Sequence, residues 1–383
     1  MKILLAGGGS GGHVTPLLAV TNELNQLQTN LSVRCVCDHK FAASTKRLMS
    51  EADLPVEVKT IWAGKWRRYN GLSWWRQLLD IQTTLLNLRD LFLIAVGYFE
   101  SLVLLIVWRP DVVFTKGGFV CVPVGLAAKT LGVPIVMHDS DAHPGLANRI
   151  LARFAHSIAT GSPLEYYDYP NAISHYVGVP ISDRFKPYDP KQKLAARADW
   201  DLPDAKRPLL VVTGGGLGAR RINQAIVESA DELIDNLGLS IVHITGQADY
   251  ERVAAQASKN AHYRLLPFVS DKMAELFGAA DIVVSRAGAT TMLELAAAQA
   301  SVIIVPNPLL TGGHQLKNAE VYRQGQAALI VHEVKLDDGD LYVAIERLVN
   351  DQPLREKLAK NLAGFAKPEA AQAVARLIVE AAK

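Results

Sequence analysis

The feature that most constrains this chain is a glycine-rich loop that occurs twice, each time directly after a short apolar run. The first is "LLAGGGSGGHVTP" at residues 4–16, and the second is "LLVVTGGGLGA" at residues 209–219. A strand that ends in glycines and leads into a helix lets backbone N–H groups approach an anion closely. Each loop therefore predicts the start of a separate α/β unit with an anion-binding turn.

The first loop has the spacing Gly7-x-Gly9-x-x-Gly12, which dinucleotide-binding enzymes share. Those enzymes also keep a ribose-binding acid after the second strand, roughly where Asp38 stands in this chain. An NAD enzyme, however, needs only one such loop, and an acid at a strand end is common. Two loops are instead typical of nucleotide-sugar transferases with two Rossmann-like domains, which leaves an NAD dehydrogenase as a remote alternative.

The rest of the chain alternates apolar runs with helical stretches, and some runs, such as "DVVFT" at 111–115, are apolar on both faces. Such runs suit a parallel sheet covered by helices, so we expect an α/β, doubly wound fold. The length of 383 residues exceeds one ordinary core, and a polar segment with three prolines at 188–208 precedes the second loop. We expect domains at 1–181 and 182–367 that face a central cleft.

Hydrophobic periodicity also places the individual elements. The expected strands are 2–6, 32–37, 56–60, 111–115, 134–138, 157–160 and 173–177, then the run from 209, 240–245, 262–266, 281–285, 301–305 and 327–332. The closing helices are expected near 336–350, 352–364 and 368–383.

Composition excludes several functional classes. A net charge of +2 argues against a dedicated nucleic-acid binder, so we expect no nucleic-acid partner. The three cysteines, Cys35, Cys37 and Cys121, are irregularly spaced, which argues against a disulfide framework or a zinc site. The apolar run after Lys2 is too short for a secretory signal, and a cytoplasmic setting is expected.

A membrane-facing surface is expected from residues 59–79, which hold five basic residues, no acidic ones and four of the six tryptophans. Tryptophan favours the membrane interface, and basic residues are attracted to anionic lipid. The apolar stretch 91–108 follows, but Glu100 makes a true span unfavourable, so a peripheral contact is predicted. The residues expected to face the membrane are Trp66, Arg67, Arg68, Trp74 and Trp75. The alternative is a core cluster with a solvated basic loop.

Two residues near the predicted anion sites point to chemistry. His13 directly follows the first loop, and an imidazole has a pKa suited to proton abstraction near neutral pH. A structural histidine that bonds a backbone carbonyl fits the spacing equally well. In "RAGATTMLELAA", Gly288 marks a helix N-terminus that suits a diphosphate, and Glu294 lies among apolar residues, where a carboxylate needs a polar partner.

Together with the first loop, six further segments resemble the MurG family of glycosyltransferases, which is glycosyltransferase family 28. They are GKWRRY (64–69), RPDVVFTKGGFVCVPVGLAA (109–128), GVPIVMHDSDAHPGLANRI (132–150), GGGLGA (214–219), SRAGATTMLELAA (285–297) and TGGHQLKNA (311–319). The resemblance implies the two-domain GT-B fold, inversion at the anomeric carbon, UDP-N-acetylglucosamine as donor, and no obligatory metal or other cofactor. It also implies that the helix at 368–383 packs back on the first domain.

The resemblance further implies a role for single residues. The donor-binding residues it implies are Ser10, Gly11, Gly12, Asp141, Gly216, Val269, Ala289, Thr290, Thr291, Glu294 and Gln315. Glu294 would bind the ribose, Gln315 the sugar hydroxyls and the backbone of Val269 the uracil. His138 and Asn148 are expected in the acceptor site or cleft, and His13 is the candidate general base.

Three parts of the sequence keep alternatives open. Asp139-Ser140-Asp141 has the DxD form of metal-dependent sugar transferases, and His138 and His143 could extend a manganese or zinc cluster. We expect no metal there, because the glycine loops already offer diphosphate sites and the family works without one. Gly216 and Leu217 replace a serine and a glutamine usual in the family, and Ser182 replaces a phosphate-binding arginine, for which Arg184 is a possible substitute.

The expected reaction transfers N-acetylglucosamine from UDP-N-acetylglucosamine to the MurNAc 4-hydroxyl of undecaprenyl-pyrophosphoryl-MurNAc-pentapeptide, a step in peptidoglycan synthesis. The expected place is the cytoplasmic face of the cell membrane, with anionic lipid and other cell-wall synthesis proteins as further partners. The alternatives are a GT-B glycolipid transferase with another lipid acceptor, a UDP-sugar epimerase, and a non-catalytic membrane-associated module of the same fold.

Overall fold

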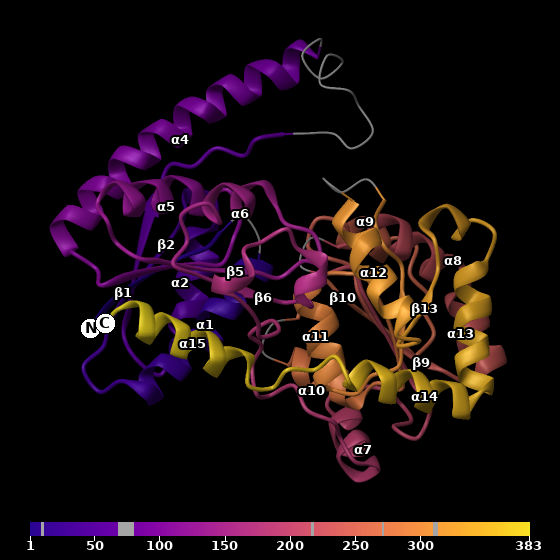
Figure 1. Cartoon of the computed structure of the whole chain (residues 1–383). Coiled ribbons are helices and arrows are strands. Elements are labelled where there is room, and N and C mark those ends of the chain that lie inside the picture. Colours follow the sequence, from indigo (N-terminus) through magenta and orange to yellow (C-terminus); the bar gives the residue numbers. More distant parts are fainter. Residues whose placement is uncertain (9–10, 68–79, 216–217, 270–271, 309–312) are drawn as a thin grey trace. The chain divides into compact units, whose positions relative to one another are not determined.

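The computed structural model describes residues 1–383 apart from 9–10, 68–79, 216–217, 270–271 and 309–312 (Figure 1). The chain divides into two compact units, residues 1–181 with 367–383, and residues 182–366. In each unit every strand pairing is parallel, and helices connect the strands. This arrangement confirms the doubly wound α/β fold that the two glycine-rich loops predict.

The first unit contains a sheet with the strand order β3-β2-β1-β4-β5-β6-β7 in the described residues. Its strands are β1 (Lys2–Ala6), β2 (Ser32–Asp38), β3 (Val56–Ile61), β4 (Val112–Thr115), β5 (Ile135–Asp139), β6 (Ser157–Thr160) and β7 (Ser174–Tyr176). Its α-helices are α1 (Gly11–Leu27), α2 (Ala42–Met49), α4 (Ile81–Trp108), α5 (Cys121–Thr130), α6 (Leu146–Leu151) and α15 (Ala370–Ala381).

Alternate residues of the strands face two separate cores. On β1, Ile3 and Leu5 pack with α1 and α15, whereas Leu4 and Ala6 pack with α4, α5 and α6. Because both faces are covered, the strands read as continuous apolar runs in the sequence. α15 belongs to the first unit, so the chain crosses between the units twice.

The second unit contains a sheet with the order β10-β9-β8-β11-β12-β13 in the described residues. Its strands are β8 (Leu209–Thr213), β9 (Ser240–Ile244), β10 (Tyr263–Leu266), β11 (Ile282–Ser285), β12 (Val302–Ile304) and β13 (Leu329–Ile330). Its α-helices are α7 (Pro190–Ala198), α8 (Arg220–Leu237), α9 (Tyr250–Ala254), α10 (Met273–Ala279), α11 (Ala289–Ala297), α12 (His314–Gln324), α13 (Asp340–Asn350) and α14 (Gln352–Ala363).

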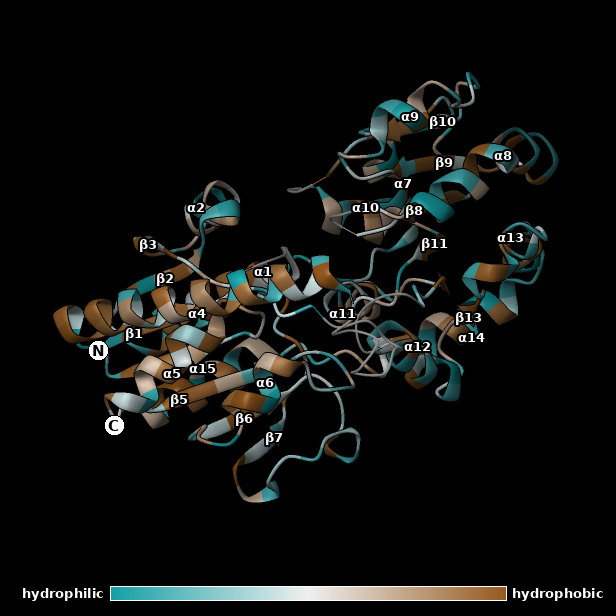
Figure 2. Cartoon of the chain, turned by 90° about the horizontal axis from the view of Figure 1, so that it is seen from above, coloured by the Kyte–Doolittle hydropathy of each residue, from teal (hydrophilic) through white to brown (hydrophobic). Residues whose placement is uncertain are grey.

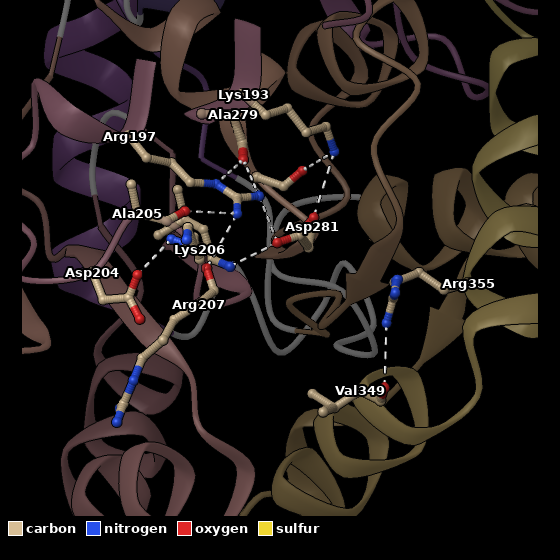
Figure 3. Close-up of polar contacts among 12 residues, drawn as sticks. Lys193, Arg197, Asp204, Ala205, Lys206, Arg207, Ala279, Asp281, Val349 and Arg355 are labelled. Atoms are coloured by element: carbon tan, nitrogen blue, oxygen red, sulfur yellow. Dashed lines mark hydrogen bonds and ion pairs between the residues drawn. The ribbon is translucent and has the colours of Figure 1, made fainter. Parts of the chain in front are cut away.

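A buried arginine fastens α7 to the amino ends of the strands in this unit (Figure 3). Arg197 donates to Ala279 O at 2.9 and 2.8 Å and to Asp281 Oδ2 at 2.6 Å, and Asp281 precedes β11. The same carboxylate accepts from the backbone N–H of Leu209, the first residue of β8, at 2.8 Å. One ion pair thus connects a helix with two neighbouring strands.

The apolar helix expected near 91–108 is longer than its hydropathy suggests. α4 begins at Ile81, where the Asp80 side chain accepts from Thr83 N at 3.2 Å as an N-cap. It ends before Arg109, which adopts a left-handed conformation with φ 53°. Figure 2 shows hydrophobic turns along α4.

Candidate active site

The topology of each sheet places a switch point at the carboxyl end of its first strand. β1 lies between β2 and β4, and β8 lies between β9 and β11, so the strand order reverses at β1 and at β8. Ligands of open parallel sheets bind beyond the carboxyl ends of the strands at such points. The two glycine-rich loops follow β1 and β8, which puts one loop at each switch point.

In the first unit the glycine-rich loop is a tight turn from β1 into α1. A Cβ atom at Gly8 would come within 2.8 Å of Asp38 Oδ1, so this position has no room for a side chain. Pro16 is the sixth residue of α1 and lies inside the helix, where it removes the N–H that would bond the carbonyl four residues earlier. Among the predicted residues of this loop, Ser10 lies outside the described residues, Gly11, Gly12 and His13 open α1, and the His13 side chain is outside the description.

Next to this loop, β4 leads into Lys116, a lysine that is 1% exposed. Its backbone N–H donates to Ala6 O at 2.9 Å, which ties it to the end of β1. Its Nζ atom donates to Ser140 Oγ. Burial lowers the pKa of Lys116 to about 8, while the carboxylates of Asp139 and Asp141 act in the opposite direction. An ammonium group is therefore held inside the protein at the switch point.

His138 continues the hydrogen bonding from Lys116. Its Nε2 atom lies 2.7 Å from Gly178 O, and since a carbonyl only accepts, Nε2 carries the proton. Burial and Lys116 hold the pKa of His138 well below its usual value, so the ring is neutral and Nδ1 is an acceptor. Ser140 Oγ lies 3.4 Å from Nδ1 and donates to it. The imidazole is fully buried and bonded on both nitrogens. The expectation that His138 lies in the binding site of the acceptor substrate stays a prediction.

A buried acidic residue, Asp139, lies at the same edge of the sheet: it ends β5 and is 2% exposed. Tyr169 Oη donates to its Oδ2 at 2.7 Å, yet burial raises the pKa of Asp139 to about 7. The Asn148 side chain, 5% exposed, also stabilises the charged carboxylate. The backbone O of Asp141 accepts from Tyr167 Oη at 2.7 Å. The predicted residues Asp141 and Asn148 thus surround one buried carboxyl group.

In the second unit, hydrogen bonds from a buried histidine lead to the residue that packs against the glycine-rich loop. His243 donates from Nε2 to Asn223 Oδ1 at 3.0 Å and accepts at Nδ1 from Tyr263 Oη at 2.6 Å. Burial lowers the pKa of His243 to about 3, so this ring is neutral. Asn223 in turn donates to Thr245 O at 3.0 Å. Gly218 has φ 77° and a Cβ there would come within 2.2 Å of Thr245 O, so the loop requires glycine at this position.

The predicted phosphate contacts form the first turn of α11. Gly288 is the N-cap residue, and Ala289, Thr290 and Thr291 follow, where helical N–H groups lack partners within the helix. Glu294 lies further along α11 and is half-buried, and burial alone raises its pKa to about 7. A carboxyl group in this state gains from a hydrogen-bond donor that a ligand brings.

The remaining donor-site predictions lie on separate connections of the second unit. Gln315, 9% exposed, is the second residue of α12 and accepts at Oε1 from Asn307 N at 2.9 Å. Val269 follows β10 and is half-buried, whereas Gly216 lies outside the described residues. Arg184 is exposed, and its backbone N–H donates to Ser182 Oγ at 3.3 Å.

Comparison with known proteins decides the family. The model of the glycosyltransferase family 28 N-terminal domain matches residues 3–160, and that of the family 28 C-terminal domain matches residues 209–374. A UDP-N-acetylglucosamine--N-acetylmuramyl-(pentapeptide) pyrophosphoryl-undecaprenol N-acetylglucosamine transferase from Shouchella clausii is 34% identical over 91% of each chain. A relative of the same name from an Exiguobacterium species is 31% identical over 99% of each chain.

The chain belongs to glycosyltransferase family 28. The crystal structure of MurG from Acinetobacter baumannii is similar to it, with 26% identity, a TM-score of 0.68 and 99% of each chain covered. This likeness confirms the GT-B fold expected from the sequence.

Only part of the predicted membrane-facing surface of this family 28 member lies in the described residues. Trp66 is 44% exposed. Arg67 donates from Nη1 to Asp90 Oδ2 at 2.6 Å and from its backbone N–H to Asn87 Oδ1 at 2.9 Å, which fastens it to α4. Arg68, Trp74 and Trp75 lie outside the described residues.

The sequence did not reveal the buried side chains that are hydrogen-bonded to one another beside the two glycine-rich loops of this family 28 member. Lys116 stands in the quoted segment 109–128, but its partner Ser140 is 24 residues away in the chain. Asn223 and His243 are likewise 20 residues apart. A polar residue directly after or within an otherwise apolar run could have indicated these side chains. Such a residue is buried whenever the strand that carries it is buried.

Proposed function

We propose that this chain transfers N-acetylglucosamine from UDP-N-acetylglucosamine to the MurNAc 4-hydroxyl of undecaprenyl-pyrophosphoryl-MurNAc-pentapeptide, with inversion at the anomeric carbon. The observation that carries the proposal is the 34% identity, over 91% of both chains, with a transferase named for this chemistry. The glycine-rich turns at the two switch points support it, because a sugar nucleotide and a pyrophosphoryl lipid are both diphosphates.

The second unit supplies the donor site. The first turn of α11 offers N–H groups to the diphosphate of UDP. Glu294 accepts hydrogen bonds from the ribose hydroxyls, which compensates the burial of its carboxylate. Gln315 bonds the hydroxyls of the sugar, and the backbone of Val269 reads the edge of the uracil.

The reaction itself is a displacement at the anomeric carbon. The acceptor hydroxyl attacks that carbon in line, His13 takes the hydroxyl proton, and the bond to the UDP oxygen breaks. The N–H groups of the loops and of the α11 N-terminus stabilise the negative charge that develops on UDP. Because these groups supply the electrostatic stabilisation, the proposal includes no resident metal ion or other cofactor.

The test is transfer by the purified full chain from labelled UDP-N-acetylglucosamine to the lipid-linked acceptor, with and without a chelator. We expect equal transfer in both cases. Transfer only from another sugar nucleotide, or only to another lipid, would overturn the substrate assignment. Loss of activity with the chelator and its return with manganese would overturn the metal-free mechanism.

The role of His13 has its own test. His13→Ala is expected to lower kcat by about 10²–10⁴-fold, the usual contribution of a general base, while KM for the donor changes little. A kcat close to that of the natural chain would show that another group takes the proton.

We also propose that the protein lies on an anionic membrane surface at the cytoplasmic face, with α4 as the main contact. One face of α4 packs on the first unit through Asp90, Gly97, Ser101, Leu105 and Trp108. The opposite face exposes large apolar side chains, each between 52% and 76% exposed: Ile81, Leu85, Leu88, Leu91, Phe92, Phe99, Val103, Ile106 and Val107. Most of these recur at three- or four-residue intervals, so they form one stripe along the helix. A stripe of this size is typical of a membrane or protein contact.

α4 is long and apolar enough to cross a membrane by length and composition. Its polar side chains, however, are bonded to the first unit: Glu100 Oε2 accepts from Trp62 N at 2.7 Å, and Asp90 Oδ2 accepts from Lys65 N at 3.2 Å. A helix that lies flat in the interface keeps these bonds and still buries its apolar stripe. For this reason we favour surface attachment over a span.

Sedimentation with vesicles that contain anionic phospholipid tests the attachment. The double substitution Phe92→Ser with Phe99→Ser removes two large side chains from the stripe and should weaken binding at least about tenfold, given the transfer energy of a phenylalanine. Val343→Ser is the matched control, because Val343 is 59% exposed on α13 of the second unit. Equal binding of all three proteins would overturn the assignment of α4.

A further inference from the structure

The Asp139-Ser140-Asp141 segment has the DxD form of metal-dependent sugar transferases, but the proposed function places no metal ion there. In this structure a side chain of the chain itself brings a positive charge to that segment. Lys116 Nζ donates to Ser140 Oγ, and both flanking carboxylates act on the ammonium. We propose that Lys116 is a positioning residue, the built-in cation of the 139–141 segment, and that it holds this segment in the arrangement the transfer reaction requires. The inference rests on the proposed function.

The hydrogen bonds from Lys116 have only one possible direction. A lysine ammonium can only donate, so Ser140 Oγ accepts from it and turns its own hydrogen elsewhere. That hydrogen goes to Nδ1 of His138, because Nε2 of the same ring already donates to Gly178 O. Each donor in the series therefore fixes the next one. Removal of the ammonium leaves the Ser140 hydroxyl with no fixed orientation.

The backbone of the 139–141 segment is held separately, from the side of β6. Gly161 N donates to Asp139 O at 2.7 Å, and a Cβ atom at Gly161 would come within 2.6 Å of Ser140 O. Tyr167 Oη bonds the carbonyl of Asp141. Because these contacts do not involve Lys116, a change at Lys116 should affect the side chains of the segment more than its fold.

Two further titratable groups near Lys116 in the described residues are neutral. Cys121, on α5, donates its thiol to Ala6 O and Gly117 O at 3.2 and 3.0 Å, and burial raises its pKa to about 12. His138 is a neutral ring. The ammonium acts on the carboxylates of Asp139 and Asp141, and a buried charge is retained only where it is compensated.

The far end of the series lies where the chain leaves the first unit. Gly178 has φ 88°, and a Cβ atom there would come within 2.4 Å of Lys367 Cβ, where the chain returns to the unit. Tyr176 faces the same residue, with Lys367 Nζ 4.8 Å from its ring centroid. The hydrogen bonds from Lys116 thus reach Gly178, close to where the chain leaves the unit, and Gly178 packs against Lys367, where it returns.

The first test compares Lys116→Met with Lys129→Met in the transfer assay. Lys129 is an exposed lysine on α5 of the same unit and serves as the control. Lys116→Met should lower kcat about 100-fold, the cost of a misplaced catalytic arrangement, with donor affinity unchanged. Lys116→Arg, which keeps a cation, should recover at least about a tenth of the activity. Equal kcat for Lys116→Met and the natural chain would overturn the proposal.

Chemical rescue separates charge from packing. A small primary amine should restore part of the activity of Lys116→Ala, whereas an alcohol of the same size should not. Rescue by manganese and not by the amine would show that the segment is a metal site and would overturn the proposal. Should the Lys116 variants fail to fold, Ser140→Ala, which removes the acceptor of the ammonium and keeps the lysine, must still lower kcat while donor affinity stays constant.

A spectroscopic readout is independent of the proposed function. In 15N spectra of the histidine-labelled full chain, Lys116→Met should move the Nδ1 resonance of His138, and Lys129→Met should not. If the natural chain transfers nothing between the proposed substrates, the proposed function fails, and this resonance still decides the placement of Lys116. An unmoved resonance would overturn it.

Discussion

Buried charges behave differently at the two ends of the strands. At the amino ends of the second sheet, Arg197 is 5% exposed and bonds backbone carbonyls as well as Asp281 (Figure 3). At the carboxyl ends of the first sheet, Lys116 is 1% exposed, and in the described part of the chain its ammonium has one direct hydrogen-bond partner, Ser140. One cation is saturated with acceptors, and the other is not.

The same contrast holds for the acidic groups at each end. Asp281 is paired with Arg197 and with the N–H of Leu209. Burial raises to about 7 the pKa of Asp139, which ends β5, and of Glu294, which lies on the helix that follows the carboxyl end of β11. Saturated charges at the amino ends stabilise the fold, whereas shifted pKa values at the carboxyl ends are typical of groups that act on a ligand.

The largest effect should come from removing the saturated cation. Arg197→Met removes the guanidinium that pairs with the buried side of Asp281 and bonds several carbonyls, so the free energy of unfolding should fall by about 3–5 kcal/mol. Urea denaturation measures this, and the activity of the folded fraction should stay unchanged. Arg323→Met, an exposed arginine on α12, should change stability by less than about 0.5 kcal/mol. A similar loss in both variants would mean that Arg197 has no special structural role.

A smaller effect is expected at the carboxyl-end acid of the second unit. Burial raises the pKa of Glu294 to about 7, and a ribose hydroxyl binds the carboxylate better than the protonated acid. Affinity for UDP-N-acetylglucosamine should therefore rise as pH rises through 7 and level off above it. Glu294→Gln should lower the affinity about tenfold, the value of a hydrogen bond to a charged group, and should abolish the pH dependence.

Calorimetric titration between pH 6 and pH 8.5, a window of roughly one to two units on either side of this pKa, measures both effects. Glu356→Gln, an exposed glutamate on α14, is the matched control. If the pH dependence persists in Glu294→Gln, another group titrates on binding, and the contrast between Glu294 and Asp281 loses its meaning.

The sequence predicts where the strands and the switch points lie, but not which buried side chains contact one another there. Glycine-rich loops after β1 and β8 locate the switch points, because glycine is needed where the backbone turns tightly, as Gly218 does against Thr245. Most strand boundaries agree within about two residues, since runs apolar on both faces identify buried parallel strands. β13 is shorter than expected, at Leu329–Ile330, and lies at the edge of its sheet.

The parts that could not be predicted are contacts between distant segments. Lys116 meets Ser140 only because β4 and β5 pair in parallel, which no local pattern encodes. The start of α4 was missed for another reason: Arg89 and Asp90 interrupt its apolar character, although Asp90 is buried against the segment before the helix. The roles of Ser10, Gly216 and the His13 side chain stay predictions from resemblance.

The dependence of stability on pH should separate the two cations. Burial lowers the pKa of Lys116 from 10.5 to about 8, so between these values the unfolded chain binds more protons than the folded one. Stability of the natural chain relative to Lys116→Met should therefore rise from pH 8 to pH 10.5, by about 3 kcal/mol for a shift of this size, and stay level below about pH 7. The corresponding difference for Arg197→Met should be flat, because arginine does not titrate in this range. Urea denaturation at several pH values gives both curves. If the Lys116 curve is also flat, the ammonium is not held in a buried site, and the two ends of the strands do not differ in the way proposed.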